Sequence, residues 1–225
     1  ENVLMATSGS RNFALDVSDV IEEAYELIGL EMRTGYDARK ARRSLNVMFQ
    51  DWMNRGVNLW TVNEVNLTLT SGTDTYALNA YDVDLMEVAI RRSGIDYTMD
   101  RITREDYLNI PNKTQTGRPT QIYLERSSTP SIKLWPVPDN STDVLVSYRV
   151  QRIEDADALT NDVDVPSRFI PCMVSGLAYY LALKNAPDRA QMAKQIYEED
   201  FARAANEDSE WGSLMIRPDN RSYGW

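Results

Sequence analysis

The stretch DARKARRSLNVMFQDWMNRGVNLWTVNEVNLTLT (residues 37–70) changes its hydrophobic period halfway along, and this change decides the fold. Its first half predicts an amphipathic helix that Asp37 caps and Gly56 ends, because apolar residues recur at intervals of three and four. This stripe consists of Ala38, Ala41, Leu45, Met48 and Trp52. From Val57 onward, apolar and polar residues begin to alternate, as in a half-buried strand. The chain therefore passes here from a helical region into a β-rich one.

Three further segments carry the helical period. The first begins near Asp16 or Ser18, ends at Gly29, and has the stripe Val17, Val20, Ile21, Ala24, Tyr25 and Ile28. The second has the stripe Ile170, Met173, Val174, Leu177, Ala178 and Leu181. The third opens with Pro187, a favoured first residue of a helix, and has the stripe Ala190, Ala193, Tyr197, Phe201 and Ala204. These stripes are too narrow to stabilise isolated helices, so we expect the four helices to share one core.

Strand patterns fill the middle of the chain. SGTD (residues 71–74) predicts a turn after the first strand, with TYAL as the returning strand. Thr103 indicates the start of a short helix, because Asp106 stands three residues later. Gly-, Pro-, Asn- and Ser-rich turns such as TGRP and PVPDNST separate the other strands. The expected strands are 62–70, 75–78, 85–92, 120–126, 131–137 and 143–152.

These patterns predict the fold class α+β. We expect a four-helix bundle formed by N- and C-terminal helix pairs, an inserted antiparallel β-rich domain, and an extended C-terminal arm. The predicted divisions are a flexible N-terminal arm, a discontinuous helical domain, a β-rich insertion that includes an acidic linker, and the C-terminal arm. Their bounds are 1–15, then 16–56 with 164–210, then 57–163, and finally 211–225.

Composition excludes several classes of function. The chain has 34 acidic and 24 basic side chains, a net charge of −10, which argues against general binding to DNA phosphates. It has no histidine, which excludes Ser-His-Asp triads and disfavours most zinc and haem sites. Its one cysteine, Cys172, has apolar neighbours and is expected to be a buried thiol. No secretory signal is visible, and the least polar stretch, 169–183, is shorter than a bilayer span.

Acidic residues also give no pattern of a catalytic or metal site. The connector IEDADALTNDVDVP (153–166) fails the calcium-loop spacing, because Leu159 and Thr160 stand where a ligand and a glycine are needed. We interpret it as a solvated linker. The acids of 198–200 and 206–210 crowd near a helix end, which is typical of a solvent face. We therefore expect a non-enzymatic protein without a cofactor.

Two sets of residues are candidates for binding a partner. The first is basic and lies on the helix of residues 37–56; it consists of Arg39, Lys40, Arg42 and Arg43, and we expect it to face a neighbouring subunit, a partner or solvent. The second is the C-terminal arm, whose large apolar and basic side chains are typical interface anchors. Packing on the chain's own helices and insertion into a partner are both open for this arm. It carries Trp211, Leu214, Met215, Ile216, Arg217, Arg221, Tyr223 and Trp225.

The order of several segments resembles the head-to-tail adaptors of short-tailed bacteriophages, the tail tubular protein A type, also called gatekeeper or head–tail connector proteins. The resemblance spans about residues 15–210 and contains no single diagnostic motif. It begins with a helix ending LIGL, continues through the opening stretch quoted above, and then follows SGTDTYAL, TGRPTQIYLER, IKLWPVPD and DVPSRFIPCMVSGLAYYLALKNAP.

This resemblance implies a structural virion protein at the head–tail junction. It implies a dodecameric ring below the portal protein that continues the DNA channel, a C-terminal arm that reaches the portal, and a β domain that meets a tail nozzle or tail tube protein. Double-stranded DNA would pass through without specific binding, and no membrane is involved. The alternatives are a tail-completion or head-completion protein of another tailed phage, or a carboxylate-dependent cell-wall hydrolase. A DNA-binding regulator is disfavoured by the charge.

Overall fold

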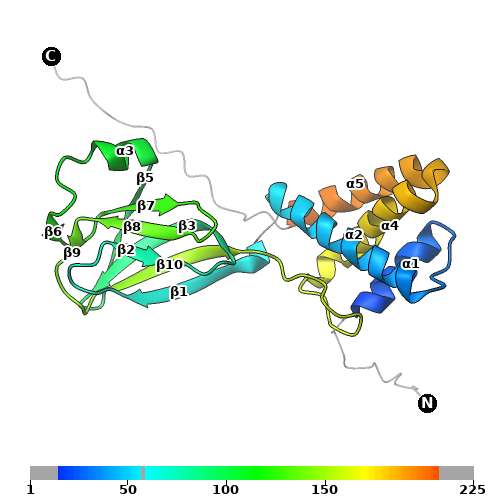
Figure 1. Cartoon of the computed structure of the whole chain (residues 1–225), viewed down its shortest axis with the longest axis horizontal. Coiled ribbons are helices and arrows are strands. Elements are labelled where there is room, and N and C mark those ends of the chain that lie inside the picture. The colour runs from blue at the N-terminus through cyan, green and yellow to red at the C-terminus, as the bar shows by residue number, and fades with distance from the viewer. Residues whose placement is uncertain (1–14, 57–58, 208–225) are drawn as a thin grey trace, which may run out of the picture.

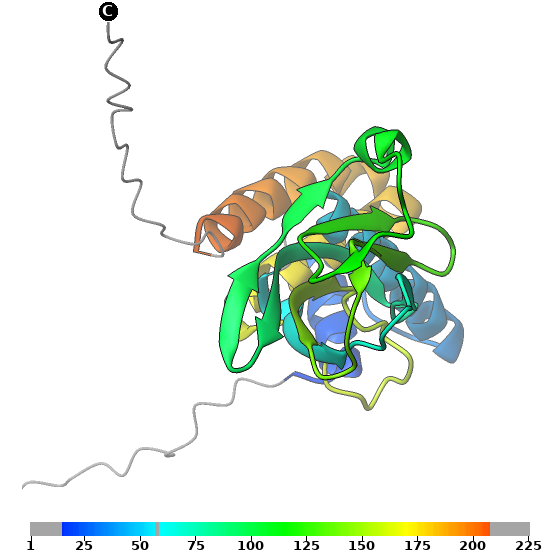
Figure 2. The ribbon, with the colours of Figure 1, turned by 90° about the vertical axis from the view of Figure 1, so that its left-hand side faces the viewer.

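The computed structural model describes residues 15–56 and 59–207, which fall into two bodies side by side (Figure 1). The helical body contains residues 15–56 and 153–207, and the β body contains residues 59–152. The chain passes between them twice, after the second helix and after the last strand. In the view along the long axis, the strands lie in front of the helices (Figure 2). The fold is thus mixed α+β, as predicted.

The first two helices begin at side-chain caps. In α1 (Val17–Leu27) the Asp16 carboxylate accepts a hydrogen bond from the Asp19 amide at 2.9 Å, which confirms one of the two predicted caps. Helix α2 (Gly35–Asn54) is capped by Thr34, so the prediction that Asp37 is its cap was wrong. Asp37 is instead the third helical residue of a capping box, and its carboxylate accepts from the Thr34 amide at 3.2 Å. The helix consequently begins before the predicted position.

Helix α4 (Ile170–Asn185) contacts α1, α2 and α5 (Ala190–Glu207), and short 3-10 turns, Ser167–Phe169 and Pro187–Arg189, precede α4 and α5. The predicted single stripe was too narrow, because α4 also buries Cys172, Ser175, Gly176 and Ala182. A Cβ atom on Gly176 would lie 2.5 Å from the Met48 sulfur and 2.8 Å from the Tyr197 ring. Glycine at this position therefore lets α2 and α5 approach the central helix closely.

Trp52 occupies the centre of the helical core and is fully buried. Its ring centroid lies 5.7 Å from that of Phe49, 5.5 Å from Phe169 and 6.4 Å from Phe201. The indole N–H donates a hydrogen bond of 2.9 Å to the Tyr197 hydroxyl. The largest side chain of α2 is thereby packed and hydrogen-bonded between elements from both ends of the chain.

Two four-stranded sheets form the β body. One has the order β1 (Val62–Thr68), β10 (Val144–Gln151), β3 (Asp82–Arg92), β4 (Ile95–Thr98), and all its pairs are antiparallel. The other has the order β2 (Thr75–Ala77), β8 (Ser131–Trp135), β7 (Gln121–Glu125), β5 (Asp100–Ile102). Both contribute to one apolar cluster, consisting of Leu69, Leu78, Leu85, Val88, Ile90, Ile122, Leu124, Ile132, Leu134 and Leu145. The sheets therefore pack face to face as a sandwich.

Several strand predictions need correction. β2 does not return along β1 but pairs with β8 in the other sheet, and β1 pairs with β10, the last strand. Two pairs are parallel rather than antiparallel, β5 with β7 and the short β6 (Thr116–Gly117) with β9 (Val137–Pro138). A 3-10 turn, Leu59–Thr61, precedes β1. The short helix α3 (Arg104–Asn109) does begin at Thr103, and Asp106 completes its capping box.

The acidic connector (153–166) is docked on the helical body rather than fully solvated. Its carboxylates are exposed, but Ile153 and Ala156 are buried in the helical core. Asn46 of α2 accepts a hydrogen bond of 2.8 Å from the Ala156 amide. Backbone amides at the start of α1 donate to carbonyl oxygens of this connector at 3.0 Å. Periodicity missed this docking because it depends on single apolar residues within an acidic segment.

Candidate functional site

The predicted basic residues lie on the outer side of α2, opposite its buried residues. Together with a neighbouring tyrosine they form what we call the basic face: Tyr36, Arg39, Lys40, Arg42 and Arg43. Tyr36 is 61% exposed, and Arg39 and Arg43 are exposed as well. A hollow of about 320 Å³ is lined by Tyr36 and the three arginines. The structure thus brings three of the four predicted basic residues, Arg39, Arg42 and Arg43, together with an aromatic ring.

Two cations of the basic face form hydrogen bonds within the chain. Arg42 donates a hydrogen bond to the Asp157 carbonyl of the connector, and Lys40 donates to the Asn185 side chain at the end of α4. Burial lowers the pKa of the Lys184 ammonium, and the nearby charges of Lys40 and Arg43 lower it further. Arg39 and Arg43 form no hydrogen bond or ion pair with the described residues. Two guanidinium groups of the basic face are consequently free to meet a partner.

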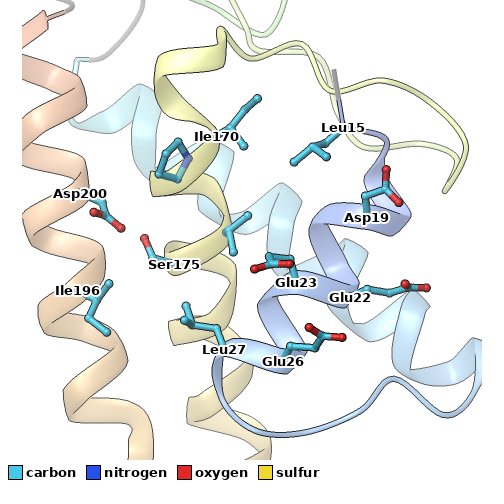
Figure 3. A pocket seen from close by; sticks show the side chains of 12 residues that line it. Leu15, Asp19, Glu22, Glu23, Glu26, Leu27, Ile170, Ser175, Ile196 and Asp200 are labelled. Carbon is cyan, nitrogen blue, oxygen red and sulfur yellow. The ribbon is translucent and has the colours of Figure 1, made fainter. Parts of the chain in front are cut away.

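A second surface, which sequence reasoning missed, is a groove of about 550 Å³ between α1 and α5 across α4 (Figure 3). We call it the acidic groove. Its apolar floor includes Ile170, Pro171 and Val174 of α4, and Asp200 of α5 lies on its other side. One rim is formed by four exposed carboxylates of α1: Asp19, Glu22, Glu23 and Glu26. Their spacing at i, i+3, i+4 and i+7 was the available signal, because such residues share one helix face.

The acidic groove and the basic face lie on opposite sides of α4. Viewed from the groove, α2 runs behind α4 and α1 (Figure 3). α2 turns its apolar residues toward α4, and the exposed residues Tyr36, Arg39 and Arg43 of the basic face lie on its opposite side. The helical body therefore presents negative charge on one side and positive charge on the other.

The acidic residues 198–200 were predicted to form a charged solvent face. One of them, Glu198, instead forms a structural ion pair with Arg55. The Glu198 carboxylate accepts two hydrogen bonds from Arg55, at 2.9 and 3.1 Å, which raise the pKa of that guanidinium. The Arg55 guanidinium lies 4.6 Å from the centre of the Phe201 ring. This pair joins the end of α2 to α5, so Glu198 is committed to holding the helices together. Asp200 lines the acidic groove and pairs with Arg203.

In residues 15–56 and 59–207 the cysteine is not activated and no metal-binding group is assembled. Burial raises the pKa of the Cys172 thiol, which disfavours the reactive thiolate. No group of three or more histidine, cysteine, aspartate or glutamate side chains in these ranges could hold a metal ion. No helix in the same ranges is long and apolar enough to cross a membrane.

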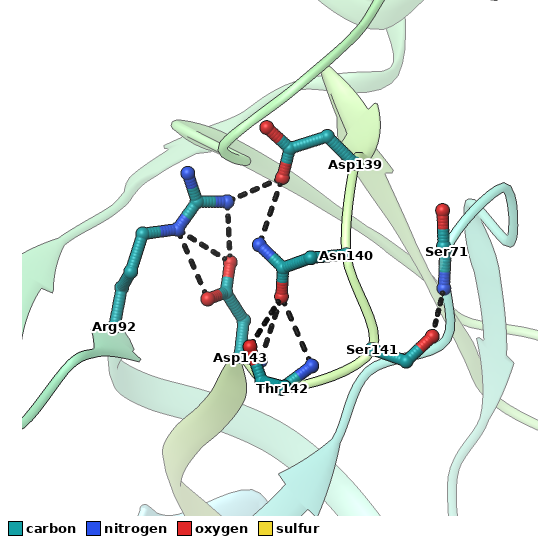
Figure 4. Close-up of polar contacts among 7 residues, drawn as sticks. All are labelled: Ser71, Arg92, Asp139, Asn140, Ser141, Thr142 and Asp143. Atoms are coloured by element: carbon teal, nitrogen blue, oxygen red, sulfur yellow. Dashed lines mark hydrogen bonds and ion pairs between the residues drawn. The ribbon is translucent and has the colours of Figure 1, made fainter.

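A polar cluster joins two predicted turns at the end of the β body away from the helices (Figure 4). Arg92 donates to both oxygens of Asp143, at 2.6 to 3.0 Å, and also pairs with Asp139, which raises the pKa of the guanidinium. The Ser71 amide of the SGTD turn donates to the Ser141 hydroxyl at 3.0 Å. Because the Asp143 side chain is 1% exposed, we interpret this cluster as a structural fastening of the two turns.

The predicted arm residues fall outside the described part of the chain, so their role stays a prediction. They are Trp211, Leu214, Met215, Ile216, Arg217, Arg221, Tyr223 and Trp225.

The family model of the SU10 adaptor protein matches residues 16–221, which is most of the chain. The chain belongs to the SU10 adaptor protein family. This adaptor is a structural protein of a bacteriophage, and its family places it among the components of the virion that contact other virion proteins. The predicted resemblance to phage adaptors is thus confirmed at this level. A comparison of this chain with curated proteins finds no match.

Proposed function

We propose that this adaptor forms a ring between the portal and the tail of a short-tailed phage, as gatekeeper-type connectors do. The ring continues the DNA channel, retains the packaged genome and lets it pass on ejection. The observation that carries the proposal is the family match over residues 16–221. It is supported by a helical body with two oppositely charged sides, which suits repeated side-by-side contacts between identical copies.

In this proposal the ring is a homododecamer, and its wall is a four-helix bundle formed by α1, α2, α4 and α5. The contacts of α4 with the other three helices, and the aromatic core around Trp52, support a rigid wall. A heterologous contact repeated around an axis closes into a ring when its rotation divides the circle evenly.

The two ends of the adaptor would meet different partners. The β body faces the tail, where a nozzle or tail tube protein docks, and its exposed apolar side chains Ile95 and Leu108 support such a contact. The C-terminal arm (211–225) binds the portal protein. Its tryptophans, tyrosine and arginines are the residue types that anchor interfaces.

The net charge of −10 supports passage of double-stranded DNA without specific binding. A channel lined by carboxylates repels phosphates, so the duplex slides instead of being held. Finding a neutral or basic channel surface in the assembled ring would overturn this part of the proposal.

The decisive experiment measures the mass of the full-length protein in solution, with and without the portal protein. We expect a monomer that becomes a dodecameric ring on the portal, and we expect deletion of residues 211–225 to abolish this assembly. A hexameric ring would point to a tail-completion protein instead. A protein that stays monomeric and ignores the portal would contradict the proposal.

A further inference from the structure

We propose that the acidic groove of one copy receives the basic face of the next copy, so that the helical bodies join head to tail. The occupant of the groove is therefore α2 of a second copy of this chain. This inference rests on the proposed ring and assigns the two surfaces that build it.

The two charged surfaces match in length and spacing. The carboxylates of α1 occupy positions 19, 22, 23 and 26, and Tyr36, Arg39, Lys40 and Arg43 repeat the same spacing on α2. Each set spans seven residue steps, which is roughly 10 Å along a helix axis. A helix laid against α1 can therefore bring the cations of this set near the α1 carboxylates, while Tyr36 is left for the groove floor.

Neither set is neutralised within its own chain. Asp19, Glu22, Glu23 and Glu26 form no ion pair with any described residue, and the same holds for Arg39 and Arg43. Like charges one helical turn apart repel each other, so each surface stores a small unfavourable energy in the monomer. Contact between the two surfaces would relieve both repulsions at once.

The apolar parts of the two surfaces also complement each other. The floor of the groove presents Pro171 and Val174 with the exposed Leu27 at its rim. The basic face presents Tyr36, and Val47 lies exposed further along the same side of α2. An aromatic ring flanked by arginines is a typical interface anchor, and the groove volume accommodates it. We therefore place Tyr36 on the groove floor and Arg39 and Arg43 against the α1 carboxylates.

The placement of the surfaces fixes the type of symmetry. They lie on opposite sides of α4, so two copies cannot satisfy both surfaces of each other. Each copy instead uses its groove toward one neighbour and its basic face toward the other. This is a heterologous contact, the kind that produces rings.

The test uses two full-length variants with matched charge reversals. The groove variant carries Glu22→Lys and Glu26→Lys, and the face variant carries Arg39→Glu and Arg43→Glu. Both pairs are exposed and four residues apart. A control with Glu87→Lys and Glu105→Lys reverses two exposed charges on the β body. Protection of Cys172 from a thiol reagent verifies that the helical body of each variant stays folded.

Ring formation on the portal protein is then measured for each variant alone and for an equal mixture of the two. We expect each variant alone to form rings roughly tenfold less than the unmodified chain, because like charges then meet at every contact. The mixture should recover, because every contact in an alternating ring again joins opposite charges. The control should assemble like the unmodified chain.

Three outcomes would overturn the inference. If the face variant assembles normally, the basic face is not the occupant of the groove. If both variants fail and the mixture does not recover, the two surfaces do not meet each other. In both cases the unmodified chain still forms a ring, so the proposed function survives. If the unmodified chain forms no ring with the portal, the proposed function fails and the interface fails with it.

Discussion

Trp52 in the helical body and the Asp82–Arg149 pair in the β body are comparably buried, but different forces hold their surroundings together. Trp52 is surrounded by Phe49, Phe169 and Phe201, and its one polar atom is satisfied by Tyr197. The core of the helical body is therefore held mainly by buried apolar area, a contribution that is non-directional, and by packing between aromatic rings.

The β body buries charge instead. The Asp82 and Arg149 side chains are 1% and 6% exposed, and they pair at 3.1 Å between β3 and β10. Gln151 donates a second hydrogen bond of 3.0 Å to the Asp82 carboxylate, and Arg149 donates one of 2.9 Å to the Ser147 hydroxyl. The pairing register of the two strands shifts on both sides of this site. A directional network thus fixes a local irregularity in the sheet.

The two bodies should therefore respond differently to mutation. An apolar core loses stability in proportion to the volume removed. A buried ion pair contributes little as a pair, yet losing one partner leaves a stranded charge. Cys172 offers a way to separate the responses, because this single cysteine lies in the core of the helical body and reports only its opening.

The largest effect is expected for Trp52→Ala. It should lower the free energy of unfolding by about 5 kcal/mol, the upper end for truncating a buried tryptophan, because the Tyr197 hydroxyl also loses its donor. Denaturant unfolding and the rate of Cys172 labelling measure it, and labelling should accelerate. Val47→Ala, at an exposed site on the same helix, is the control and should change little. Unchanged labelling in the Trp52 variant would show that the core does not depend on this ring.

Arg149→Met should lower the free energy of unfolding by about 3 kcal/mol, because it strands the buried Asp82 carboxylate. The loss is smaller than for Trp52, since Gln151 still donates to Asp82. Hydrogen exchange should accelerate in β3 and β10, while Cys172 stays protected. Adding Asp82→Asn should restore part of the stability by removing the stranded charge. A double variant no more stable than the single one would contradict this account.

The helical body was largely predictable from the sequence because its stabilising residues are local and periodic. Each apolar stripe predicts one helix, and Asp16 predicts the start of α1. What escaped was the extra width of the buried surface of α4, which includes Gly176 and Ser175. Neither residue is apolar enough to signal a core position, and Gly176 is buried because α2 and α5 both approach α4 there.

The β body and the candidate site were less predictable because their contacts join distant segments. The strands β1, β2, β3, β7, β8 and β10 were recognised, whereas β4, β5 and β6 were missed. The partner of β1 is the strand that follows some eighty residues later, as the pair Val65 and Ser147 shows. Arg149 gave no sign of burial, since only the strand register reveals its partner. The basic residues of α2 were found as a charge run, whereas the acidic groove needed α1, α4 and α5 to come together.

A smaller effect is expected where the acidic connector docks on α2. Asn46→Ala should lower the free energy of unfolding by about 1–2 kcal/mol, because the buried Ala156 amide loses its acceptor. Hydrogen exchange at the Ala156 amide should accelerate, while the strands of the β body stay protected. Gln50→Ala, an exposed site one turn further along α2, should leave this exchange unchanged. Equal exchange in both variants would show that Asn46 does not hold the connector.

The smallest effects are expected from the pH dependence of stability. Removing one carboxylate in each body distinguishes how the two bodies respond to acid. Hydrogen bonds from the Asp19 amide and the Ser18 hydroxyl hold the pKa of Asp16 below its usual range. A lowered pKa in the folded state stabilises the protein above the unfolded pKa, and this contribution is lost as the pH falls through the folded pKa. Asp16→Asn keeps a capping oxygen without the charge, so the stability that it loses near neutral pH should no longer differ from the unmodified chain toward about pH 2. Cys172 labelling with an aromatic disulfide reagent, which still reacts with thiols in acid, measures this difference.

Asp96→Asn provides the matched change in the β body. Hydrogen bonds from Arg91, at 2.7 and 2.8 Å, lower the pKa of Asp96, so the sign of its pH dependence is the same. Cys172 labelling should nevertheless ignore this substitution at every pH, because Asp96 lies on β4 and the thiol lies in the helical core. If both variants changed the labelling rate equally, the two bodies would open as one cooperative unit, and the contrast between their cores would have no consequence for stability.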